Sequence, residues 1–300
     1  MKVDEFAPLG GHAAAGREAT RLALEAGAAS GQSGRIPISG AAVGRRRDGS
    51  LEVICVGVNG RIPGGDGIGY PTDHGETGAI RGIKDVGAVD WPEVVFATTL
   101  SPCIMCTRTL VHLHGLGLRR LVVAESQSFA GRKDLLRPLS GMQIVELSHP
   151  PAVAMMQRFA RRYPWDWAAD IGEVPPASPV QDLDIHALLD ALSQTGADAG
   201  VFDALGHCVA TAQDGRAATG GNPVHSAAML AMGRAGSAIN LREHLLVVDH
   251  AGTLDLAGFG PSSLGACELF RPAAVVTRGP VSPGLGEPLR AAGIQVLSQR

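Results

Sequence analysis

Long apolar runs, an excess of one charge and a secretion signal are all absent from this 300-residue sequence. No apolar stretch approaches the length that a membrane helix needs, and the N-terminal residues lack the apolar core of a signal peptide. The 26 basic and 29 acidic residues leave a net charge of -3, and aromatic residues make up only 4% of the chain. Neither feature favours a basic, aromatic groove for nucleic acid. We therefore expect a cytoplasmic protein with no membrane and no nucleic-acid partner.

Cysteines are also few, and their number is odd. The five are Cys55, Cys103, Cys106, Cys208 and Cys267, and without an export signal this count does not indicate a disulfide framework. Only Cys103 and Cys106 are closely spaced, in the stretch PCIMC. A lone C-x-x-C leaves three interpretations open: a metal site, a redox pair or two buried thiols.

Strand and helix patterns alternate along the first 173 residues. An alanine-rich helix over residues 11–30 is followed by two strands that flank the turn RDGS. Further strands are expected at 94–100 and 119–126, each preceded by a helix, and at 143–148, where the next element is a strand or a helix. This alternation predicts an α/β layered domain over residues 1–173.

Three prolines in ten residues predict a linker over residues 174–182. After it, the order of expected elements repeats over residues 183–300: helix, hairpin, helix, strand, helix, strand and strand. We interpret this as a weak internal duplication, which predicts a second α/β domain.

Two short motifs carry candidate chemistry. Catalytic zinc takes three protein ligands and keeps one position for water, and His74, Cys103 and Cys106 supply three. Glu76, two residues after His74, is a base that can hold the proton of that water without binding the metal. Residues at i and i+2 do not share a helix face, so His74 and Glu76 can converge only at a helix start.

The residues before each motif predict where these helices begin. We expect Asp73 to be the N-cap of the first helix, and Ser101 to be the N-cap of the second with Pro102 at its first position. The thiols would then lie in a first turn, where unpaired backbone N–H groups favour thiolates.

The combined pattern, H-x-E followed by P-C-x-x-C, is the signature of zinc-dependent deaminases. Residues 1 to 173 resemble the cytidine deaminase superfamily, and within it the fungal cytosine deaminases. The matching stretches are HGE, TLSPCIMCT, LVVAESQSF and MMQRFARRYPWDWAADIGE. The resemblance implies a three-layer α/β/α fold around a five-stranded sheet, here in tandem. It also implies hydrolytic deamination of a free, cytosine-like nucleobase or a related small amino-heterocycle, with water as the other substrate.

The resemblance also implies roles for individual residues. It implies Zn²⁺ held by His74, Cys103 and Cys106, with Glu76 as the proton shuttle. Four further matches implicate Asn59 and Asp170 in hydrogen bonds to the base, and Phe129 and Trp167 in packing around it.

The second copy lacks most of this machinery. His225 is expected where the first copy has His74, but HSA replaces HGE, so Ala227 stands at the position of the glutamate. SLGAC replaces PCIMC, which puts Leu264 at the first cysteine and leaves Cys267 alone. We expect this degenerate domain to hold no zinc and to be non-catalytic.

Several alternatives remain open. Guanine, triazine, pterin and creatinine-type rings are rival substrates, and a non-catalytic ligand-binding protein is the rival from another class. The resemblance implies homodimers or larger assemblies. We hypothesise that residues 183–300 replace the partner subunit, as a pseudo-dimer within one chain that is itself a monomer or a homodimer.

Overall fold

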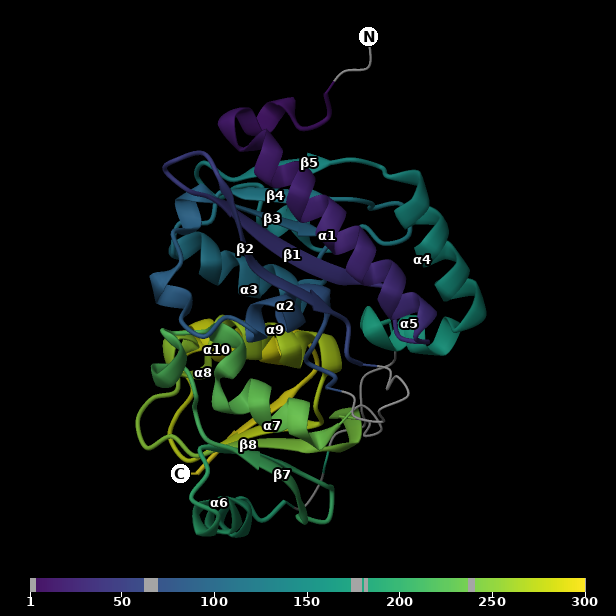
Figure 1. Ribbon diagram of the computed structural model, residues 1–300. Helices are drawn as coiled ribbons and strands as arrows, with labels where there is room; N and C mark the ends of the chain where they lie inside the picture. The colour runs from purple at the N-terminus through teal and green to yellow at the C-terminus, as the bar shows by residue number, and fades with distance from the viewer. Residues whose placement is uncertain (1–3, 62–69, 174–179, 181–182, 237–240, 300) are drawn as a thin grey trace.

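The computed structural model describes residues 4–61, 70–173, 180, 183–236 and 241–299, and these ranges contain two five-stranded sheets (Figure 1). The first sheet has the order β2-β1-β3-β4-β5, and the second, read in the same sense, has β7-β6-β8-β9-β10. In both, the first two strand pairs are antiparallel and the last two are parallel. The tandem α/β prediction is confirmed by this repeated topology. The predicted linker at 174–182 lies, except for residue 180, outside the described residues.

The first half supplies five strands and five helices among the described residues. Its elements are α1 (Ala13–Gln32), β1 (Ser39–Arg45), β2 (Leu51–Val58), α2 (Gly75–Arg81), β3 (Val94–Thr98), α3 (Ile104–Gly115), β4 (Arg120–Val123), β5 (Gln143–Glu146), α4 (Pro150–Arg162) and α5 (Pro164–Asp170).

The second half follows the same order up to its last strand, with two additional helices, α8 before α9 and α10 before β10, and no described helix after that strand. Its elements are α6 (Ile185–Gln194), β6 (Ala199–Phe202), β7 (Cys208–Ala212), α7 (Ala227–Ala235), β8 (Leu245–Val248), α8 (Leu256–Phe259), α9 (Pro261–Phe270), β9 (Ala274–Thr277), α10 (Pro283–Ala291) and β10 (Gln295–Ser298). The helix α10 was not predicted from the sequence.

Each face of the first sheet is covered by helices, because successive side chains of its buried strands point to opposite faces. In β1, Ala41 and Val43 pack in one hydrophobic cluster with Ala19 of α1. The intervening Ala42 packs in another cluster with residues of α2 and α3, including Leu110. The predicted three-layer α/β/α arrangement is therefore confirmed for the first half.

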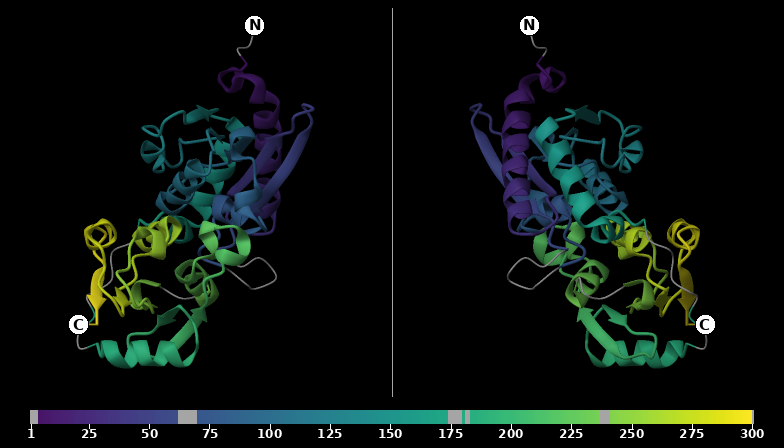
Figure 2. Two further views of the ribbon diagram at one scale, coloured as in Figure 1. Left: turned by 90° about the vertical axis from the view of Figure 1, so that its left-hand side faces the viewer. Right: turned by 90° about the vertical axis from the view of Figure 1, so that its right-hand side faces the viewer.

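The two halves meet through their inner helices, as Figure 2 shows from both sides. The cluster that holds Ala42 continues into the second half, through Met229 of α7 and Leu264 of α9. A Cβ atom on Gly265 would lie 2.7 Å from the Cα of Met105, so α9 approaches the α3 backbone closely. One apolar core is thus shared by both halves, and its burial opposes their separation.

Polar contacts flank this crossing of α3 and α9. The Arg108 guanidinium donates two hydrogen bonds to the Glu268 carboxylate, and the hydroxyls of Thr109 and Ser262 are 2.8 Å apart. Since α3 and α9 occupy equivalent places in the two sheets, the halves contact each other through matching elements, as in an isologous dimer. None of the helices in the described ranges has the length and apolarity needed to span a bilayer.

Candidate active site

Three side chains with metal-binding atoms meet between the starts of α2 and α3. His74 is the N-cap of α2, Cys103 is the N-cap of α3, and Cys106 is the third residue of α3. Their ligand atoms all lie within 4.8 Å of one another, and all three residues are buried. Across the described part of the chain, they form the only such group of at least three His, Cys, Asp or Glu residues.

The predicted N-caps are wrong, and the difference explains the geometry. His74 and Cys103 themselves have the extended backbone of an N-cap, with ψ of 173° and 179°. Asp73 instead pairs with Arg81, and the Ser101 hydroxyl donates to the carbonyl of Ala130. Because an N-cap side chain lies beside the helix end, His74 can face the first turn of α3.

The two thiols differ in acidity because they share one environment. Burial disfavours the Cys103 thiolate, but the Cys106 thiol, His74 and the backbone N–H of Cys106 stabilise it and hold its pKa well below the usual value. Burial and the neighbouring Cys103 thiolate raise the pKa of Cys106. The thiol pair therefore carries negative charge in a buried position.

The imidazole of His74 lies between this thiolate and a carboxylate. Its Nδ1 atom is 3.3 Å from Cys103 Sγ, and its Nε2 atom is 3.3 Å from Asp170 Oδ1, an ion-pair distance without the alignment of a hydrogen bond. Burial opposes the charged ring, but Asp170 and Cys103 outweigh it and raise the pKa of His74 to about 9. The ring is thus oriented from both sides.

Glu76 lies beside the thiols and is almost fully buried, with 2% of its surface exposed. Its Oε1 atom accepts a hydrogen bond of 2.8 Å from the Thr98 hydroxyl at the end of β3. Burial and the charge of Cys103 raise its pKa to about 7. A carboxyl group held in this way is suited to exchange protons near neutral pH.

The predicted base-binding residues Asn59 and Asp170 are brought together. Asn59, just after β2, donates from Nδ2 to both carboxylate oxygens of Asp170, at 3.1 and 3.3 Å. The Arg61 guanidinium donates to the carbonyl of Ala169 and lies 3.9 Å from the same carboxylate. Residues from distant parts of the sequence therefore fix Asp170 next to His74.

Phe129 and Trp167 also meet, in a T-shaped pair with ring centroids 6.0 Å apart. Trp167 comes from α5, three residues before Asp170, and Phe129 from the loop after β4. Both pack beside the cluster of Ile36, Leu100 and Phe159. Their contact with a bound base stays a prediction.

The second half contributes a residue that the sequence did not indicate. Phe270, the last residue of α9, lies edge-on to His74, with ring centroids 6.3 Å apart and an interplanar angle of 77°. The Arg61 guanidinium lies 5.4 Å from the centre of the same ring. Phe270 therefore forms a wall of the site from across the junction between the halves.

The residues of the second half that correspond to the three candidate ligands differ from those predicted. The N-cap of α7 is Ser226, so Ser226 and not His225 corresponds to His74, and Gly260, the N-cap of α9, corresponds to Cys103. Ser263, three residues after Gly260, corresponds to Cys106. Ser226 and Ser263 are joined directly by a hydrogen bond of 2.7 Å between their hydroxyls.

His225 and Cys267 have other surroundings. His225 Nε2 lies 3.2 Å from the carbonyl of Arg81 in the first half, and Cys267 is buried in the middle of α9. The alignment of His225 with His74 was therefore off by one residue, because the turn before α7 places Ser226 at the helix start.

With this geometry established, the comparison with known families is informative. Residues 15–125 match the family model described as the cytidine and deoxycytidylate deaminase zinc-binding region. Over these residues the chain is similar to a deaminase zinc-binding region. The matched segment contains Asn59, His74, Glu76 and both clustered cysteines, whereas Phe129, Trp167 and Asp170 lie beyond it.

The chain is also similar to individual proteins. The chain is 33% identical over 100 residues to a cytosine deaminase from Candida albicans; the match covers 33% of this chain and 64% of the relative. A solved structure from work on adenosine-to-inosine editing by tRNA deaminases is 22% identical, covers 46% of this chain and 99% of its own, and has a TM-score of 0.35. A mutant protein solved with 8-azaguanine is 23% identical, covers 48% and 83%, and has a TM-score of 0.37.

The donor set of the His74–Cys103–Cys106 cluster fits zinc. Two thiols and one imidazole are among the ligands that Zn²⁺ prefers, and all five cysteines of the chain are free rather than in disulfides. A carboxylate behind a ligating histidine is the arrangement that orients such ligands in metal sites. Asp170 has that place relative to His74.

Sequence reasoning missed Thr98, Arg61 and Phe270. Thr98 and Arg61 lie close in sequence to predicted elements, in the stretches FATTLS and NGR, but nothing in those stretches marks their contacts. Phe270 reaches the site only through the packing of α9 on α3, which no local pattern encodes.

Proposed function

We propose that this protein is a zinc-dependent hydrolytic deaminase of a free, cytosine-like nucleobase or a related small amino-heterocycle. The observation that carries the proposal is the position of Glu76, a carboxyl group buried against a thiolate and held by Thr98. Burial of an ionisable carboxyl group costs free energy, and groups with pKa values shifted in this way concentrate at functional sites. In the equivalent place of the second half, α7 has Ala228.

In this proposal His74, Cys103 and Cys106 hold the zinc ion. When bound there, zinc would lower the pKa of a water molecule toward neutrality and so make a nucleophile available.

Glu76 moves the protons of the reaction. It takes one proton from the attacking water and gives it to the ring nitrogen of the amidine. It then takes the remaining proton from the newly attached hydroxyl and gives it to the departing amine. The ring carbon gains a C–O bond and loses its exocyclic C–N bond, so water and the amino-heterocycle yield the oxo-heterocycle and ammonia. Thr98 keeps Glu76 oriented during both transfers.

Asn59 and Asp170 orient the ring. The Asp170 carboxylate can accept a hydrogen bond from the exocyclic amine, which selects amino over oxo rings, because an oxo group has no proton to donate. Phe129 and Trp167 would cover the faces of the ring and exclude water.

We further propose that the second half is non-catalytic and acts as an internal partner subunit. Helices α3 and α9, which occupy matching places in the two halves, pack against each other, and Phe270 lies beside His74 in the first site. In the second half, Ser226 is hydrogen-bonded to Ser263 at the positions where the first half has His74 and Cys106. Two hydroxyls cannot replace the thiolates and imidazole of a zinc site.

The proposal is tested by incubating the zinc-loaded protein with amino-pyrimidines, amino-purines and amino-triazines and measuring ammonia. We expect release from cytosine or a close analogue. Zinc-loaded protein that releases ammonia from none of these rings would contradict the proposed function and favour a ligand-binding role.

A further inference from the structure

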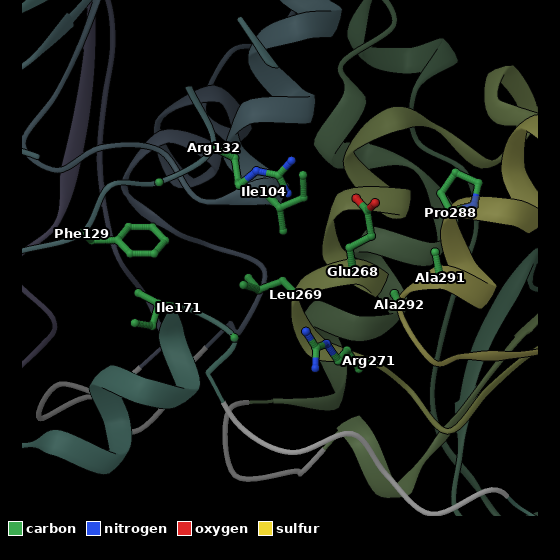
Figure 3. A pocket seen from close by; sticks show the side chains of 12 residues that line it. Ile104, Phe129, Arg132, Ile171, Glu268, Leu269, Arg271, Pro288, Ala291 and Ala292 are labelled. Atoms are coloured by element: carbon green, nitrogen blue, oxygen red, sulfur yellow. The ribbon is translucent and has the colours of Figure 1, made fainter. Parts of the chain in front are cut away.

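A cavity of about 360 Å³ lies between the two halves, next to the candidate active site (Figure 3). On one side it is lined by Ile104, which follows Cys103, by Ile171, which follows Asp170, and by Phe129. On the other side it is lined by α9 and α10, including Leu269 and Arg271. This wall of the cavity is therefore built from Phe129 and from the immediate chain neighbours of Cys103 and Asp170.

Arg271 has an uncommon backbone conformation at the edge of this cavity. It caps the C-terminus of α9 with φ of 51° and ψ of 64°, in the left-handed region. Among the described residues, only Ser148 and Arg271 have positive φ without being glycine. A left-handed residue other than glycine costs about 1–2 kcal/mol, so a glycine at this helix end would be the less strained choice.

The Arg271 side chain is also incompletely satisfied. Its buried Nε atom has no hydrogen-bond partner in the part of the chain that the structure describes. A buried guanidinium N–H without an acceptor is unfavourable. Arg271 lines the cavity, so the terminal N–H groups of its guanidinium, rather than the enclosed Nε, are the donors that a ligand with acceptor oxygens would meet there.

The other charged residues of the cavity leave it positive. Glu268 lines it, but both of its oxygens are taken by Arg108. Arg132 lines it as well, and its ion pair with Asp134 is exposed, so that pair is weak.

More positive charge lies close by. Burial, together with repulsion from Arg61 and Arg271, lowers the pKa of Arg242 to about 10. Arg61, in turn, lies over the ring of Phe270, the residue before Arg271. Several guanidinium groups therefore gather on this side of the site, which favours an anion.

We propose that this cavity binds an acidic substituent of the substrate, with Arg271 as the principal contact and Arg132 as the second. The substrate class is then an amino-heterocycle that carries a carboxylate or a phosphate group. This inference rests on the proposed function and restricts its substrates to rings that carry an acidic group.

The test compares rings that differ only in the acidic group. Cytosine against 5-carboxycytosine examines a carboxylate, and cytidine against cytidine 5′-monophosphate examines a phosphate. We expect kcat/KM to be about tenfold or more higher for the acidic member of one pair, as expected for a charge-assisted hydrogen bond. Equal values within both pairs would overturn the inference while leaving the deaminase proposal intact.

Three variants assign the effect to Arg271. R271G removes the guanidinium and suits the left-handed backbone, so it should fold and lose the preference for the acidic member of the pair. R271K should keep part of the preference. The matched control is R158A, an exposed arginine on α4, which should behave as the wild type. A preference that persists in R271G would contradict the assignment.

Calorimetric titration supplies a readout that does not depend on catalysis. Inorganic phosphate and acetate are titrated into the zinc-loaded wild type and into R271G. We expect at least one anion to bind the wild type detectably and more weakly to R271G. If neither anion binds the wild type, the cavity is not an anion site, whatever the protein deaminates.

Discussion

The ring of Phe270 lies edge-on to the ring of His74, with the centroids 6.3 Å apart, although the two residues belong to different halves of the chain. The first half therefore does not enclose its candidate active site alone. The second half, which has Ser226 and Ser263 at the positions equivalent to His74 and Cys106, contributes a wall to the site of the first half.

Phe270→Ala should weaken both folding and activity. Phe270 is buried, so its truncation should lower the free energy of unfolding by about 3–5 kcal/mol. Loss of the wall beside His74 should also lower kcat/KM by about tenfold to a hundredfold. Thermal unfolding and steady-state kinetics measure the two effects. Phe270→Leu, which keeps most of the volume, is the control and should retain most activity; unchanged kcat/KM in Phe270→Ala would show that the wall has no catalytic role.

Metal removal should destabilise the protein through the His74–Cys103–Cys106 cluster. A ligand that binds only the folded state stabilises it by about 2.7 kcal/mol at a concentration one hundred times its Kd. Chelation should therefore lower Tm, and added zinc should restore it.

The matched variants for this prediction are Cys103→Ser and Cys208→Ser. The first removes a proposed ligand and should abolish the response of Tm to zinc. The second changes an exposed cysteine outside the cluster and should leave the response intact. A response that survives Cys103→Ser would mean that zinc acts elsewhere.

Gly265→Ala should strain the junction between the halves. The added Cβ would lie 2.7 Å from the Cα of Met105, and backbone at that distance has to move. We expect a loss of about 1–3 kcal/mol in the free energy of unfolding, as for other overpacked sites. Gly284→Ala in α10 is the control, because its Cβ meets nothing within 4 Å and should be neutral or stabilising. Equal stability of both variants would argue against a tight crossing of α3 and α9.

His225 should make the stability of the junction depend on pH. Burial lowers its pKa in the folded protein below the ordinary value, so the unfolded chain binds the proton more readily. The stabilisation that the neutral His225 ring gives the folded protein is therefore fully present above the unfolded pKa of about 6.5. It is lost as the pH falls from there through the folded pKa. The free energy of unfolding of the wild type, relative to that of His225→Gln, should therefore fall as the pH is lowered from about 7.5 to about 5.5, across the unfolded pKa of about 6.5. A pH-independent difference would contradict this role.

Much of the first half could be predicted because its patterns are local. The turn RDGS between β1 and β2 is a short signal that tertiary packing did not override. The helix α10 escaped prediction because its sequence, PGLGEPLRA, contains two glycines and two prolines, one of them inside the helix. Its packing beside α9 stabilises it despite that composition.

The candidate site was predictable in its residues but not in its surroundings. H-x-E and P-C-x-x-C identified the side chains that the structure brings together. The one-residue error at His225 arose because a helix start depends on backbone angles, which the letters PVHSA do not fix. Phe270, Arg61 and Arg271 depend on how two domains dock, and such contacts leave no periodic trace in a sequence.

The most direct test of the central claim measures ammonia release by wild type and Glu76→Gln at equal zinc content, with a ring that the wild type deaminates. The variant keeps the size of the side chain and an oxygen for Thr98 but cannot carry protons. We predict that both proteins bind one zinc ion and that the variant loses about a hundredfold or more in kcat. Ammonia release by the variant at the wild-type rate would contradict the account.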